Sequence, residues 1–267
     1  MKMLKKKIMQ IIKDYLFLKG YFLEKRTSLS EIKMFIKCLR PYKTNVELIR
    51  IGDEKDGGYL LPNDLLDIEA CFSPGVGRKS TFEKSLAQQG IKGFLADRSV
   101  DSIPDFHDNL FFLKKYVGCY NSEDFITLDK WIETSVLNKK SDLILQMDIE
   151  GAEYEVLSSV SEENLERCRI IVIEFHFLHK LWNKRFFDFV NPVIKKILKT
   201  HTCVHIHPNN ISETSKHLGI EIPPLLEITF LRNDRIAQKD YELNFPHELD
   251  RDNTPKPHMA LPECWYK

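Results

Sequence analysis

The chain has 267 residues, of which 43% are hydrophobic and 29% charged, a balance typical of one sizeable globular domain. Lys plus Arg and Asp plus Glu both total 39, so no overall electrostatic field favours binding to nucleic acid. The six cysteines are scattered without a Cys-x-x-Cys pair, which argues against a zinc cluster and predicts free thiols. No apolar run approaches the roughly 20 residues of a membrane span, and the N-terminal lysines precede no unbroken apolar segment of a secretory signal. We therefore expect a cytoplasmic protein.

Residues 1–45 are predicted to form a helical N-terminal arm, separate from a second unit of residues 46–267. Leu4, Ile8 and Ile12 recur at helical spacing, with lysines on the other side of the helix. Such an arm can pack on the body or on another subunit of a homo-oligomer. Alternatively, as a basic amphipathic helix, it can make a weak contact with an anionic membrane surface.

From residue 46 onward, short apolar runs alternate with helical stretches. The predicted strands cover residues 68–72, 93–96, 110–117, 143–147, 170–173, 204–206 and 226–230. A helix after the first strand is expected to begin with a capping box, because Ser80 and Glu83 have its spacing. The alternation predicts an α/β fold, namely a Rossmann-like, seven-stranded, mostly parallel sheet with helices on both faces. From about residue 232 the sequence is polar and proline-rich, which predicts a tail.

Glycines and polar side chains follow the predicted strands at the points where each strand ends. Ligands of such sheets bind beyond the carboxyl ends of the strands, so these residues are candidates for a site. In chain order they are Ser73, Gly75 and Gly77, then Asp97, then Asp148 with Glu150 and Glu153, then Glu174 with His176, and finally His205, His207, Asn209 and Asn210. A carboxylate in the position of Asp97 can accept hydrogen bonds from both ribose hydroxyls. The first turn lacks the full Gly-x-Gly-x-x-Gly pattern of a dinucleotide site.

Four segments carry a resemblance to a known family. They are Asp56–Tyr59, Ser73–Gly77, Gln146–Glu153 with its Asp-Ile-Glu-Gly-Ala-Glu motif, and His205–Asn210. Over roughly residues 47–232 the chain resembles the FkbM family of methyltransferases. The resemblance implies a class I methyltransferase fold, S-adenosylmethionine as cofactor and O-methylation. We therefore expect an O-methyltransferase for a sugar or nucleotide-sugar hydroxyl in bacterial surface polysaccharide biosynthesis.

The resemblance also implies which residues contact the cofactor. The expected set is Gly58, Tyr59, Ser73, Gly75, Gly77, Asp97, Asp148 and Glu150. The chain departs from the family at Ser73, because the first glycine motif of the family usually begins with an acidic residue. The contact with the amino group of the cofactor's methionine is then expected from elsewhere, near Asp56–Tyr59.

A sugar hydroxyl is a poor nucleophile at neutral pH, so the reaction needs a general base or a metal ion. Asp148, Glu174 and His207 are mixed oxygen and nitrogen ligands suited to Mg²⁺ or Mn²⁺. Without a metal, His176 or His207 is the candidate base, beside Asp148 as a third catalytic residue. These groups also have a purely structural interpretation, in which they only form hydrogen bonds with one another.

Three further residues are candidates for substrate binding. Asn209 and Asn210 can bind sugar hydroxyls or form a turn, with the sequence favouring neither. Trp182 can stack on a sugar, although its aromatic-rich neighbourhood favours packing in the core.

Two other classes of protein compete with a methyltransferase. A nicotinamide-dependent sugar oxidoreductase or epimerase is disfavoured because its glycine motif and Tyr-x-x-x-Lys pair are missing. A non-catalytic, methyltransferase-like scaffold of a glycan-assembly complex is disfavoured by the many acids and histidines at the strand ends.

Overall fold

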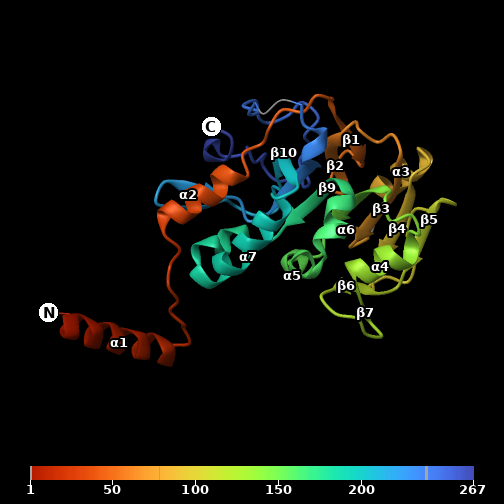
Figure 1. Cartoon of the computed structure of the whole chain (residues 1–267). Coiled ribbons are helices and arrows are strands. Elements are labelled where there is room, and N and C mark those ends of the chain that lie inside the picture. Colours follow the sequence, from red (N-terminus) through yellow and green to blue (C-terminus); the bar gives the residue numbers. More distant parts are fainter. Residues whose placement is uncertain (1, 78, 238–239) are drawn as a thin grey trace.

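A twisted sheet of seven strands forms the centre of the protein (Figure 1). The computed structural model describes residues 2–77, 79–237 and 240–267. The sheet contains β3 (Ile68–Pro74), β4 (Lys92–Ala96), β5 (Leu110–Leu113), β8 (Asp142–Met147), β9 (Cys168–Phe175), β10 (His201–Pro208) and β13 (Leu226–Arg232). Their order is β10-β13-β9-β8-β3-β4-β5, and only β13 runs antiparallel to its neighbours. The predicted Rossmann-like, mostly parallel sheet is confirmed, and six strands end at one edge, which we call the carboxyl edge.

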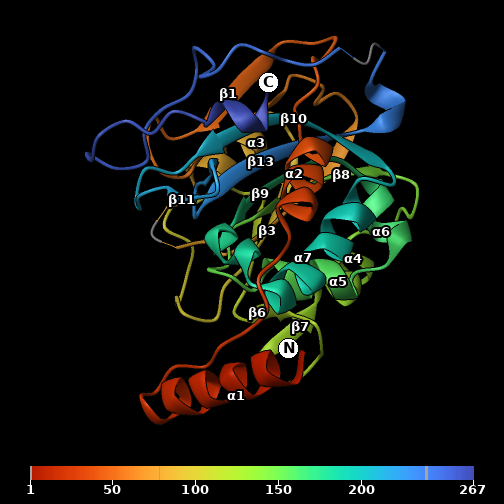
Figure 2. The ribbon, with the colours of Figure 1, turned by 90° about the vertical axis from the view of Figure 1, so that its left-hand side faces the viewer.

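Two hydrophobic cores lie on the two faces of this sheet. Side chains of a strand alternate between the faces, so Leu143 and Leu145 join one core and Ile144 joins the other. One face is covered by α2 (Leu29–Cys38), α4 (Leu128–Ser135), α5 (Glu153–Ser159), α6 (Glu162–Arg167) and α7 (Lys184–Ile197). The other face is covered by α3 (Thr81–Gln88) and the antiparallel pair β1 (Leu48–Gly52) and β2 (Gly58–Pro62), as Figure 2 shows from the side.

Short elements complete the fold. They are the parallel pair β6 (Tyr116–Gly118) and β7 (Phe125–Thr127), the antiparallel pair β11 (Ser215–His217) and β12 (Ile220–Ile222), and the 3-10 helices η1 (Leu178–Trp182), η2 (Asn233–Arg235) and η3 (Glu263–Trp265). The strand predicted over residues 110–117 is wrong in its last part. The Lys115 N–H donates to the Leu113 carbonyl at 2.8 Å and turns the chain, so the residues after it pair with β7 instead.

The predicted helical arm divides into two parts. Helix α1 (Lys2–Leu18) extends away from the body (Figure 1). Its apolar side chains, such as Leu4 and Ile11, are exposed. Helix α2 belongs to the body, because Ile32 and Phe35 are buried in the core and Ser28 forms a capping box at its start. Packing on the body is therefore true of α2 and not of α1. Within the described residues, no helix combines the length and hydropathy that crossing a membrane requires.

The segment after β13 has little regular structure, yet much of it is packed on the domain. Trp265 is fully buried, and its indole N–H donates to the Glu221 carbonyl at 3.0 Å. Asp250 accepts a hydrogen bond from His205 at 2.8 Å. This part of the chain is a cover over β10 rather than a free tail. The six cysteines are free thiols, as predicted.

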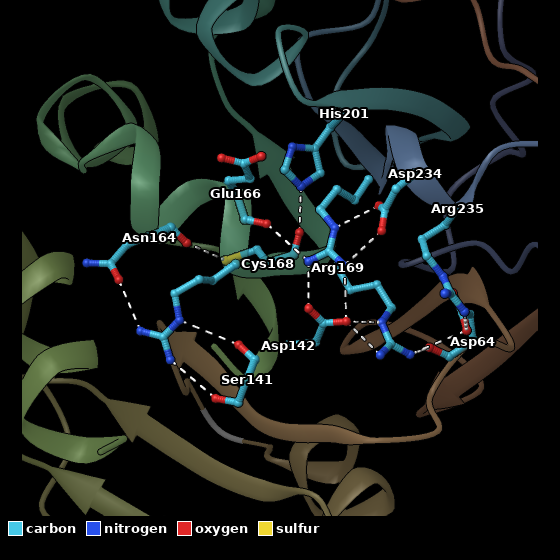
Figure 3. Close-up of polar contacts among 12 residues, drawn as sticks. Asp64, Ser141, Asp142, Asn164, Glu166, Cys168, Arg169, His201, Asp234 and Arg235 are labelled. Atoms are coloured by element: carbon cyan, nitrogen blue, oxygen red, sulfur yellow. Dashed lines mark hydrogen bonds and ion pairs between the residues drawn. The ribbon is translucent and has the colours of Figure 1, made fainter. Parts of the chain in front are cut away.

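Ion pairs connect side chains at the edge of the sheet opposite the carboxyl edge (Figure 3). Asp142 at the start of β8 accepts from Arg169 at 2.7 Å and from Arg232 at 2.6 Å. Asp64 lies between Arg169 and Arg235, and binds Arg235 at 2.7 Å. Because these acids and guanidinium groups neutralise one another, this edge has a structural role.

Candidate functional site

Two adjoining cavities open at the carboxyl edge. The larger cavity has a volume of about 400 Å³ and the smaller cavity about 250 Å³. Gly75, Gly77 and Asp148 line both, so the cavities meet where β3 and β8 end. Together they have the size of a small-molecule site.

The larger cavity is lined by a carboxylate and by aromatic rings. Asp97 follows β4 as predicted, and its Oδ1 accepts from the backbone and hydroxyl of Ser99 at 2.7 and 2.6 Å. Its Oδ2 makes only a long contact, 3.4 Å, with the Gly77 N–H. Tyr116 and Phe125, with ring centroids 5.4 Å apart, also line this cavity. A flat, polar group with vicinal hydroxyls fits such a space.

Glycine is required at the junction of the two cavities. Gly75 has a φ of 91°, and a Cβ there would lie 1.7 Å from the Asp148 carbonyl oxygen. Gly77 also has a positive φ, of 57°, but its surroundings are open. Gly58 is different, because it is the first residue of β2, where it pairs with Gly52, and does not line either cavity. Its neighbour Tyr59 does line the smaller cavity.

Ser73 does not reach the cavities, contrary to the prediction. Its side chain is fully buried, and its hydroxyl contacts the Glu83 carboxylate and lies 2.6 Å from Gln146 Oε1. Glu83 and Gln146 line the smaller cavity in its place. The predicted capping box is also wrong, because Glu83 points inward while Ser80 pairs with Asp105.

A histidine and three acids gather beside the junction. The ligand atoms of Asp148, Glu150 and His176 all lie within 4.8 Å of one another. His176 Nε2 is 3.3 Å from Glu150 Oε2 and 3.8 Å from Asp148 Oδ1. On its other side, His176 Nδ1 lies 3.0 Å from Glu153 Oε1, which also accepts the Gly151 N–H at 2.9 Å. Glu153 therefore fixes the imidazole with Nε2 directed to the two acids.

The charges of this group perturb one another. Burial raises the pKa of Asp148 to about 7, and Glu150 and Glu153 add to the effect while His176 opposes it. Burial lowers the pKa of His176, but the hydrogen bond and charge of Glu153, together with the other two acids, outweigh it and raise the pKa overall. The protonation state of Asp148 therefore affects the pKa of His176, and that of His176 affects the pKa of Asp148.

The three predicted metal ligands do not form one group. β13 lies between β9 and β10, so Glu227 pairs with Glu174 on one side and with His207 on the other. His207 Nδ1 is instead 3.5 Å from Asp250 of the C-terminal segment. Among the described residues, Asp148 shares ligand distances with Glu150 and His176 rather than with Glu174 and His207. His207 lines neither cavity. The pKa of Glu174 is raised well above its usual range, mainly by burial and further by the negative charges of Asp148 and Glu227.

The predicted substrate residues also lie outside both cavities. Asn209 is buried and donates to Glu174 at 2.9 Å. Asn210 holds the C-terminal segment by accepting the Thr254 N–H at 2.9 Å and donating to the Thr254 carbonyl at 3.0 Å. Trp182 is 8% exposed and belongs to the core. Hydrogen bonding within the fold explains both asparagines.

Sequence reasoning missed two functional features of this site. Glu153 was expected only as one of the acids that follow the strand of residues 143–147, whereas its carboxylate lies 3.0 Å from His176 Nδ1. Glu83 was assigned to a cap, whereas it faces a cavity. The Asp-Ile-Glu-Gly-Ala-Glu motif signals the first feature, but nothing local in the sequence signals the second.

Part of this domain is similar to a known protein family. The family model described as Methyltransferase FkbM domain matches residues 94–201. Over these residues the chain is similar to FkbM methyltransferase domains. The match includes the motif that ends at Glu153, and also His176, which supports a methyltransferase. The first glycine turn and the His205–Asn210 segment lie outside the matched range of the FkbM domain.

Solved structures resemble the whole chain only distantly. Spermidine synthase from Thermotoga maritima has 10% identity and a TM-score of 0.37, with 79% of each chain covered. A spermidine synthase in complex with the transition state analogue AdoDATO has the same identity and TM-score, over 79% of this chain and 80% of that one. A putative methyltransferase from an antibiotic biosynthesis pathway of Anabaena variabilis ATCC 29413 has 15% identity and a TM-score of 0.27, over 54% of this chain and 59% of that one. No curated protein matches the chain.

Proposed function

We propose that the protein is an S-adenosylmethionine-dependent O-methyltransferase whose acceptor is a hydroxyl of a sugar or nucleotide-sugar. The observation that carries the proposal is the meeting of the two cavities at Gly75, Gly77 and Asp148, beside the His176–Glu153 pair. The family match supports the methyl transfer. The sugar acceptor and the setting in bacterial surface polysaccharide biosynthesis rest on the family resemblance.

The cavities fit the two halves of the cofactor. Asp97 Oδ2 is free to accept the ribose hydroxyls, and Tyr116 and Phe125 offer flat surfaces for the adenine. The methionine part then occupies the smaller cavity, and the sulfonium lies near the junction. The cofactor supplies the methyl group and the leaving thioether. The backbone at Gly75 can approach it closely because no Cβ intervenes.

His176 is the proposed general base. Its Nδ1–H donates to Glu153, which leaves the lone pair of Nε2 for the proton of the acceptor hydroxyl. As the acceptor oxygen bonds to the methyl carbon, its proton passes to Nε2, and the positive charge of the imidazolium is stabilised by Glu153 and Asp148. A positioned base of this kind is worth about 10²–10⁴-fold in rate.

Alternatively, Asp148, Glu150 and His176 bind a divalent cation, and His176 is then a metal ligand and not the base. Two carboxylates and an imidazole suit Mg²⁺ or Mn²⁺, and Asp148 Oδ1 is buried without a hydrogen-bond partner. Asp148, Glu150 and His176 would hold the ion, which would lower the pKa of the acceptor hydroxyl. Activity that survives EDTA assigns His176 to the base role, whereas activity lost with EDTA and restored by Mn²⁺ assigns it to metal binding.

The proposal is tested with methyl-labelled S-adenosylmethionine and a panel of sugars and nucleotide-sugars, with product detected by mass spectrometry. We expect one panel member to gain a methyl group, and a His176→Gln variant to bind cofactor without turnover. Cofactor binding without methylation of any member would contradict the sugar acceptor. Binding of NAD, with no binding of S-adenosylmethionine, would favour an oxidoreductase or epimerase. A variant with full activity after loss of His176 would leave the catalytic assignment without support.

Helix α1 supports a second, weaker proposal about partners. Its exposed apolar side chains, together with Lys6, Lys7 and Lys13, suit a contact with an anionic membrane surface. A homo-oligomer joined through α1 is the alternative. Sedimentation with anionic vesicles and analytical ultracentrifugation of the full chain distinguish the two.

A further inference from the structure

A buried carboxylate in the smaller cavity has no cationic partner among the described residues. Glu83 on α3 is 5% exposed and lines this cavity. Lys79 lines the same cavity, but its ammonium group binds Asp53 at 2.6 Å, and Lys84 lies 3.7 Å from Asp105. A buried charge without a partner is costly, and a cationic ligand in the cavity would reduce this cost.

When Glu83 is ionised, the groups around it are short of hydrogen-bond donors. The Ser73 hydroxyl has a single proton, but it contacts both the Glu83 carboxylate and Gln146 Oε1. Gln146 lines the same cavity. Burial raises the pKa of Glu83, with Asp105 adding to the effect and the hydrogen bond from Ser73 opposing it. A cationic donor in the cavity would provide hydrogen bonds to Glu83 and Gln146 Oε1, and its charge would also favour the ionised form of Glu83.

We propose that Glu83, with Gln146 beside it, binds the α-ammonium group of the methionine part of S-adenosylmethionine. The proposal rests on the proposed function, which places the methionine part in the smaller cavity. Glu83 on α3 would thus supply a carboxylate to this cavity, whereas Ser73 stands at the end of β3, where the family usually has an acidic residue. Asp56, Gly57 and Tyr59, from the segment expected to make this contact, line the same cavity, so Glu83 adds a second carboxylate to that of Asp56.

The test compares two probes by titration calorimetry. S-adenosylhomocysteine carries the α-ammonium group, whereas 5′-methylthioadenosine has the same adenosine and sulfur without it. The variant is Glu83→Gln, which keeps the shape and an acceptor for Ser73 but loses the charge. The matched control is Glu133→Gln on α4, whose residue is exposed. Thermal unfolding is measured for each protein to confirm that it is folded.

We expect Glu83→Gln to weaken binding of S-adenosylhomocysteine by about 10- to 100-fold, the usual effect of a hydrogen bond to a charged group. Binding of 5′-methylthioadenosine should change less than about twofold, and Glu133→Gln should bind both probes like the wild type. Unchanged affinity of Glu83→Gln for S-adenosylhomocysteine would overturn the inference and leave the proposed function standing. An equal loss for both probes would also overturn it, because Glu83 would then only shape the cavity. A wild-type protein that binds neither probe would instead refute the proposed function.

Discussion

Replacing Asp148 by asparagine is expected to stabilise the protein and to abolish its activity. Asp148 ends β8 beside two further acids, and burial raises its pKa from 3.8 to about 7. The folded protein therefore holds a proton that the unfolded chain releases near pH 4. Asparagine has almost the same shape and no charge to bury.

The size of the effect follows from the two pKa values. A tenfold change in a protonation equilibrium corresponds to about 1.4 kcal/mol. A carboxyl group whose pKa rises from 3.8 to about 7 thus destabilises the folded state by roughly 4 kcal/mol at pH 8. Loss of the attraction between Asp148 and His176 opposes this gain, so we expect Asp148→Asn to raise the free energy of unfolding by about 2–4 kcal/mol at pH 8. Because the pKa is raised in the folded state, the difference shrinks as the pH falls toward 4.

Urea unfolding of wild type and variant at pH 8 and pH 5 measures the effect, with methyl transfer assayed in parallel. Turnover should fall by about 10²-fold or more, since the variant lacks the charge that stabilises the protonated imidazole. Glu133→Gln, an exposed carboxyl-to-amide change, serves as the control and should alter neither quantity. A variant less stable than the wild type at pH 8 would show that the Asp148 carboxylate is held favourably, and the electrostatic account of the site would be refuted.

Three further changes test other parts of the structure. Glu153→Gln should lower the pKa of His176, because Glu153 raises that pKa. The rising limb of the pH–rate profile should therefore move to lower pH, with about a tenfold loss of turnover. An unchanged profile would exclude Glu153 as the group that raises the pKa of the base. Gly75→Ala should destabilise the protein by about 3 kcal/mol or more in urea unfolding, because its Cβ meets the carbonyl oxygen at the end of β8. Gly77→Ala, with open surroundings and only its positive φ to oppose it, should cost about 1–2 kcal/mol, and equal losses would contradict the close approach. Deleting residues 1–20 should leave the melting temperature and the cofactor affinity unchanged, because the α1 side chains are exposed. Binding to anionic vesicles should be lost. A large drop in melting temperature would mean that α1 packs on the body.

The strands were predictable because each is a short apolar run that the sheet buries on both faces. All seven predicted strands occur in the central sheet, and Asp97, Asp148 and His176 follow strands as expected. The β1–β2 hairpin was not predicted, although Asp56–Tyr59 marks its turn. The division of residues 1–45 was also missed, since α1 and α2 have similar periodicity and only burial separates them.

The sequence by itself determined the α/β architecture and the edge of the sheet at which the polar residues collect, because hydrophobic periodicity and strand direction are local properties. Only the tertiary structure decided which of those residues meet. The insertion of antiparallel β13 separates His207 from Asp148, and the packing of α3 under β3 directs Glu83 into the cavity that Ser73 does not reach. Contacts of this kind depend on the order of strands in the sheet and on the rotation of a helix against the sheet. Neither can be predicted from the residues of one segment alone.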